Sequence, residues 1–199
     1  GCGYLTTIDK MDENKESEHR RIQDSIRQNR YAKGCKFKER EINNCFNRAG
    51  SNYPIDTLPE IFICSLKYSG IDTLMLCKYI YDNGSSSYEK VFVLWIDKGE
   101  GFIKGYYNNE TYQPMESEVK KFEVLALLND FFRLNVNNVK GLPKSNLTMS
   151  HSMGYCMQVM VPDLFYCERL PSYLVESDLK NPKSIWWKQV ENSINENRP

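Results

Sequence analysis

Runs of apolar residues divide the chain into strand-like segments separated by turn-forming residues. Four runs follow one another closely, at 60–68, 73–81, 88–97 and 101–107, and two more lie at 155–161 and 164–170. The separators are rich in Gly, Ser, Asn and Asp, and Pro162-Asp163 stands between the last two runs. Such residues are typical of hairpin loops. The pattern predicts about six antiparallel strands arranged as a meander.

Two later segments carry helical patterns that would cover this sheet. The stretch 116–134 has a broad apolar stripe at helical spacing, and 182–195 begins with Pro182 after Asn181, a favoured helix entry. Both alternating sets of the run 91–96 are apolar, so we expect a central strand that is buried on both faces. The predicted fold is therefore α+β, an antiparallel sheet of about six strands covered by one or two helices.

The N-terminal region has a different composition. Residues 9–41 hold 18 charged side chains, and the few apolar ones fall partly at helical spacing. Such a stretch does not form a core by itself. We therefore expect residues 1–50 to be a charged, partly helical arm or tether, followed by a single domain over 51–199.

Composition and charge name no partner. The 199 residues carry 26 Lys and Arg against 26 Asp and Glu, with a pI near 6.9, so no overall basic field favours nucleic acid. The longest apolar runs are far shorter than the roughly 20 residues of a membrane-spanning helix. No nucleic acid partner and no membrane-spanning helix are expected.

The chain begins Gly1-Cys2 without an initiator Met. A Cys that follows a small residue at the start resembles a processed bacterial lipoprotein, and the charged arm would suit a tether. The resemblance implies that Cys2 carries a lipid anchor and that the protein lies at the cell envelope or is secreted. The alternatives are that Cys2 is an ordinary thiol, and that the chain is a cytoplasmic partner protein.

If Cys2 carries lipid, six cysteines remain, and these can pair in several ways. A hairpin between 60–68 and 73–81 would place Cys64 opposite Cys77. Cys156 and Cys167 flank the Pro162-Asp163 turn, although a bulge or slip is needed to bring them opposite each other. Cys35 and Cys45 would close a short loop. The alternative is that the strand cysteines are small buried hydrophobic residues without a disulfide partner.

Recognised catalytic and metal-binding motifs are not found in the sequence. The one local Cys and His combination is Cys156 with His151, which would make the chain a secreted cysteine hydrolase. No nucleophile signature surrounds any Cys, and no Gly-rich phosphate loop or Gly-x-Ser-x-Gly occurs. Because His19 and His151 are the only histidines and no Cys-x-x-Cys occurs, we expect no metal and no cofactor.

Aromatic residues offer the most plausible binding groups. Tyr106, Tyr107 and Tyr112 follow the fourth predicted strand, and Trp187 lies in the last helix. Exposed Tyr and Trp rings suit protein or glycan recognition, although neighbouring Tyr106 and Tyr107 point to opposite faces, so that one of them should be core. The sequence favours a non-enzymatic, envelope-tethered or secreted protein that binds a protein or a glycan.

Overall fold

A computed structural model describes residue 21 and residues 57–82, 87–108, 114–146 and 154–197. These residues form a seven-stranded antiparallel sheet with the strand order β4-β3-β2-β1-β6-β7, and the short β5 pairs with β3 beyond β4. The predicted α+β class, with an antiparallel sheet covered by helices, is confirmed. The predicted arm over 1–50 and residues Cys2, Cys35, Cys45, Tyr112 and His151 lie outside the described residues.

The elements follow one another in a simple order. They are α3 (Thr57–Tyr68), β1 (Leu74–Asp82), β2 (Ser87–Asp97), β3 (Glu100–Asn108), β4 (Pro114–Glu116), β5 (Lys120–Lys121), α4 (Val124–Arg133), the 3-10 helix η3 (Val136–Asn138), β6 (Gly154–Val161), β7 (Leu164–Pro171), α5 (Ser172–Ser177) and α6 (Pro182–Glu196).

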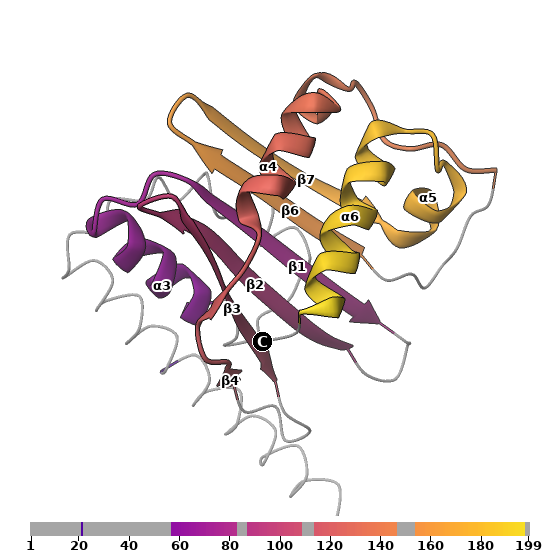
Figure 1. Cartoon of the computed structure of the whole chain (residues 1–199). Coiled ribbons are helices and arrows are strands. Elements are labelled where there is room, and N and C mark those ends of the chain that lie inside the picture. Colours follow the sequence, from indigo (N-terminus) through magenta and orange to yellow (C-terminus); the bar gives the residue numbers. More distant parts are fainter. Residues whose placement is uncertain (1–20, 22–56, 83–86, 109–113, 147–153, 198–199) are drawn as a thin grey trace, which may run out of the picture.

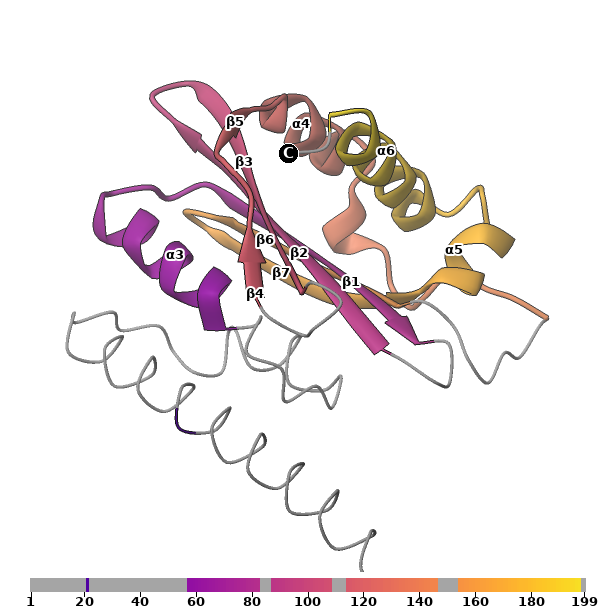
Figure 2. The same cartoon turned by 90° about the horizontal axis from the view of Figure 1, so that it is seen from below.

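The sheet lies between two layers of helices. Helix α3 covers one face, whereas α4 and α6 cover the other (Figures 1 and 2). The central strand β2 contributes to both cores, with Phe92 and Leu94 packed under α4 and α6, and Val93 and Trp95 packed under α3. The prediction that this strand is buried on both faces is therefore confirmed.

The prediction of a strand at 60–68 is wrong, because this segment is helix α3. Leu58, Phe62 and Leu66 recur at four-residue spacing and pack on one side of the helix against the sheet. Gly70 ends the helix with φ +91°, its N–H donating to the Lys67 carbonyl, while the next N–H donates to the Leu66 carbonyl. What resembled a hairpin turn is thus a helix C-terminus.

The helix predicted at 116–134 is shorter than expected. Helix α4 begins only at Val124, and the residues before it form β4 and β5 along the edge of β3. Ser117 fixes this segment, because its Oγ accepts the Gly105 N–H at 2.8 Å and its own N–H donates to the Gly105 carbonyl. Tertiary hydrogen bonds with β3 therefore delay the helix by two turns.

The remaining predicted elements are confirmed. The β2–β3 turn is Lys98-Gly99, with both residues at positive φ, as tight hairpins require. Pro162-Asp163 joins β6 to β7 with Val161 opposite Leu164, so no bulge is present. Helix α6 starts at Pro182, and the Asn181 side chain caps it by accepting the Lys183 N–H at 3.0 Å.

Candidate functional site

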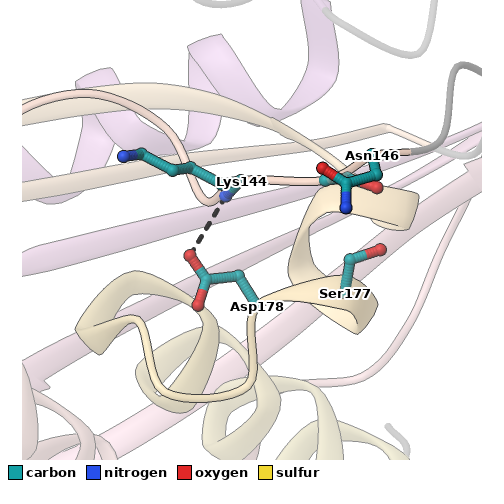
Figure 3. A pocket seen from close by; sticks show the side chains of 5 residues that line it. Lys144, Asn146, Ser177 and Asp178 are labelled. Atoms are coloured by element: carbon teal, nitrogen blue, oxygen red, sulfur yellow. Dashed lines mark hydrogen bonds between the residues drawn. The ribbon is translucent and has the colours of Figure 1, made fainter.

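A polar pocket lies beside the short helix α5, where the loop after η3 meets the loop before α6. Its volume is about 530 Å³. We call it the α5 pocket, and its lining residues are Lys144, Ser145, Asn146, Ser177 and Asp178. Figure 3 shows Asn146 and Ser177 on neighbouring sides of it, whereas the Lys144 side chain extends away from Asp178. The interior therefore presents a carboxylate, hydroxyl groups and an amide.

Backbone hydrogen bonds around Asp178 hold the two walls of the pocket together. The Asp178 Oδ2 accepts the Lys144 N–H at 3.0 Å, across 34 residues of sequence (Figure 3). The Asp178 N–H donates to the Leu174 carbonyl, and the Asp178 carbonyl accepts the Asn181 N–H. Asp178 thus follows α5 and joins the two loops that line the pocket.

A largely buried ionic network also holds the loop that carries Lys144. The Lys183 Nζ donates to the Glu168 Oε1 at 2.7 Å and to the Gly141 carbonyl at 2.5 Å. Tyr166 donates its hydroxyl hydrogen to the other Glu168 oxygen at 2.5 Å. Burial, together with the hydrogen bond to the Glu168 carboxylate and the charge of that group, raises the pKa of Tyr166 above its ordinary value. The network links β7, α6 and the 141–146 loop.

Two exposed leucines stand close in sequence to the lining residues. Leu142 is 43% exposed and Leu179 is 62% exposed, and each lies within two residues of a lining residue on a different wall. Pro143, between Leu142 and Lys144, is buried and fixes the loop. Exposed leucines on two loops that are joined by a hydrogen bond are the kind of apolar surface that protein partners cover.

The aromatic residues predicted to form a binding patch are not assembled on one surface. Tyr106 is 1% exposed and lies in the core under α3. Trp187, a residue of α6, is 0% exposed and packs against Tyr79 and Tyr155. These two rings are on opposite faces of the sheet. Tyr107 is half-buried. The prediction that one of Tyr106 and Tyr107 is core is confirmed, but Tyr106 and Trp187 do not contribute exposed rings.

The predicted pairs Cys64–Cys77 and Cys156–Cys167 are wrong. Cys77 and Cys156 are both buried thiols, whereas Cys64 and Cys167 are each disulfide-bonded. Cys64 lies in a helix, and the register places Cys77 opposite Phe92. Cys156 faces Arg169, two residues along β7 from Cys167. The predicted pair Cys35–Cys45 lies outside the described residues, and the alternative of buried strand cysteines without a disulfide holds for Cys77 and Cys156.

Cys156, the nucleophile of the hydrolase alternative, is 1% exposed in the middle of β6. Its neighbour across the sheet is Lys78 on β1, which is also buried. A substrate therefore has no direct access to the thiol in this conformation. In the part of the chain that the structure describes, no group of three His, Cys, Asp or Glu side chains is placed to hold a metal ion.

Sequence reasoning missed the α5 pocket for a clear reason. The sequence predicts a helix entry at Asn181-Pro182, as the structure has it, but no pocket beside it. Nothing in the sequence pairs Lys144 with Asp178, because the contact is made by a backbone N–H. The exposed leucines within polar loops were the one available signal.

Comparisons with known proteins give no further indication of function. No protein-family model matches this chain, and a search of curated proteins also finds no match. Among the described helices, none has the length and apolar character needed to cross a membrane.

Proposed function

We propose that this chain is a non-enzymatic binding protein that recognises a protein partner through the α5 pocket and its two flanking leucines. The observation that carries the proposal is that exposed Leu142 and Leu179 stand within two residues of the lining residues Lys144 and Asp178, which a hydrogen bond joins. Apolar anchors around hydrogen-bonding groups are the usual composition of a protein interface.

A protein partner is favoured over a glycan by the character of the lining. Sugar rings are usually stacked on exposed aromatic rings, whereas none of the described residues that line the α5 pocket is aromatic. Tyr106 and Trp187, which would have supplied such rings, are buried in the two cores. The hydrolase alternative is disfavoured because Cys156 is nearly inaccessible.

We place this binding protein at the cell envelope or outside the cell. The disulfide-bonded state of Cys64 and Cys167 supports an oxidising compartment, since disulfides persist mainly outside the cytosol.

Site-specific photo-crosslinking in cells that express the full chain tests the proposal. A benzophenone amino acid replaces Leu142 or Leu179, and Val119, an exposed apolar residue before α4, serves as the matched control. We expect both pocket positions to cross-link the same protein, identified by mass spectrometry, and Val119 not to do so. Equal products at all three positions, no product, or a product that is a glycan would overturn the proposal.

A further inference from the structure

Three exposed lysines lie on the two chain segments that line the α5 pocket or border its lining residues. Lys140, Lys144 and Lys180 are exposed, and we call them the basic rim. Within the described residues, none of their ammonium groups takes part in an ion pair. Such charges are ordinarily hydrated, and they become available to a partner that supplies carboxylates.

Acidic side chains of the neighbouring elements β7 and α5 are already paired with other lysines. Glu168 accepts from Lys183, and Glu176 is paired with Lys188. Asp178 remains, and its carboxylate holds the Lys144 N–H. The two segments 140–146 and 177–181 therefore carry three lysines against one aspartate, so their net charge is positive although the whole chain is neutral.

The basic rim is held in place by the same contacts that form the pocket. Lys140 precedes Gly141, whose carbonyl is bonded to Lys183, and Lys180 stands between Asp178 and the capping residue Asn181. Both segments that carry the three lysines and the two leucines are thus held by side-chain hydrogen bonds, which lowers the ordering cost of binding a partner.

We infer that the partner of the α5 pocket is an acidic protein segment that carries apolar residues between its carboxylates. The carboxylates would meet the basic rim, the apolar side chains would cover Leu142 and Leu179, and the pocket would accept a hydrogen-bonding group between them. Charge complementarity of this kind directs association and selects partners more than it sets affinity. The inference rests on the proposed protein-binding function and names the chemistry of its partner.

Nuclear magnetic resonance titration of the ¹⁵N-labelled full chain tests the inference with a soluble peptide of Glu, Leu and Gly. Matched peptides carry Gln or Lys in place of every Glu. We expect only the acidic peptide to shift the amides of 140–146 and 177–181, with binding that weakens as salt rises. An equal effect of the Gln peptide, or shifts elsewhere only, would overturn the inference.

Charge reversal provides the variant control. The double substitution Lys144→Glu with Lys180→Glu should weaken binding of the acidic peptide by about tenfold. Lys98→Glu with Lys120→Glu makes the same change of charge in the β2–β3 turn and in β5, which pairs with β3 beside that turn, and should leave binding unchanged (Figure 1). Equal weakening by both variants would overturn the inference.

Two further results separate the possible outcomes. Binding to phosphatidylglycerol vesicles without binding to the acidic peptide would identify a membrane surface as the partner and overturn the inference. Cross-linking of a protein at Leu142 and Leu179, combined with no acidic-peptide binding, would leave the proposed function standing while the acidic partner is rejected.

Discussion

The ammonium group of Lys183 lies 2.7 Å from the Glu168 carboxylate, and the two side chains are only 4% and 18% exposed. This pair joins the start of α6 to the edge strand β7, and the same ammonium group holds the Gly141 carbonyl. A charge in such a position is stabilised only while its partner remains, because water cannot replace the lost interaction.

Lys183→Met should therefore lower the free energy of unfolding by about 3 kcal/mol. Urea unfolding followed by tryptophan fluorescence measures it. The double variant Lys183→Met with Glu168→Leu should recover part of this loss, since it leaves no buried unpaired carboxylate. The exposed pair Lys121–Glu100 is the control, and Lys121→Met should cost less than about 1 kcal/mol. Equal losses for both single variants would contradict the buried character of the Lys183 pair.

Gly101 on β3 should not accept any side chain. A Cβ at this position would lie 2.2 Å from the Phe122 carbonyl oxygen and 3.0 Å from Val124, where the chain enters α4. Gly101→Ala must push this segment off the sheet edge and disturb the hydrogen bond from the Phe122 N–H to the Gly101 carbonyl. We expect a loss of about 1–3 kcal/mol in the free energy of unfolding, measured by urea titration.

Gly99 provides the control for this steric argument. No atom lies within 4 Å of a Cβ placed there, although its φ of +82° is left-handed. Gly99→Asn should cost much less than Gly101→Ala, since Asn tolerates this backbone conformation. A larger loss for Gly99→Asn would show that backbone strain, not crowding at Phe122, limits this part of the sheet.

The apolar pattern predicted the sheet well because its strands are bounded by local turn chemistry. Lys98-Gly99 and Pro162-Asp163 fix two hairpins with little help from the rest of the chain. The segment 60–68 was misassigned because a short apolar run fits a strand and a helix equally well. Pro59, in the first turn of α3, and the four-residue spacing of Phe62 and Leu66 were the signals that favoured the helix.

The candidate site was harder to predict because it is made by contacts between distant segments. The Lys144–Asp178 and Lys183–Gly141 hydrogen bonds join segments that are more than 30 residues apart in sequence. The prediction that Tyr106 and Trp187 belong to an exposed binding patch failed because large aromatic rings are favoured in a core wherever one can enclose them. Trp187 packs at 4.3 Å from the Tyr155 ring, so the feature that suggested a ligand-binding role serves packing instead.

Glu191 on α6 should make stability depend on pH. Burial raises the pKa of Glu191, and the nearby Glu176 carboxylate adds to this, while Lys188 and the hydrogen bond from Tyr155 act in the opposite direction. A carboxyl group whose pKa is higher in the folded state binds protons more tightly there. Its contribution to stability is therefore present at low pH and lost as pH rises from ~4.3 through the folded-state pKa.

Glu191→Gln should accordingly be as stable as the parent below about pH 4 and more stable at pH 7. Thermal unfolding across this range measures the difference. Glu196→Gln, at the exposed end of the same helix, is the control for the substitution itself and should change stability at pH 7 by less than Glu191→Gln does. A parent protein that is more stable than Glu191→Gln at neutral pH would mean that Lys188 and Tyr155 favour the ionised Glu191 more than burial disfavours it.

The thiols of Cys77 and Cys156 should resist alkylation in the native protein. Both are buried in adjacent strands, and burial raises the pKa of Cys77, which leaves little reactive thiolate. Peptide mass spectrometry after iodoacetamide treatment at neutral pH should find both unmodified, and both modified after unfolding in guanidinium. If Cys156 were labelled rapidly while Cys77 stayed protected, β6 would open near its thiol. The hydrolase alternative with His151 would then regain support over the binding function, because only an accessible thiolate can act as a nucleophile.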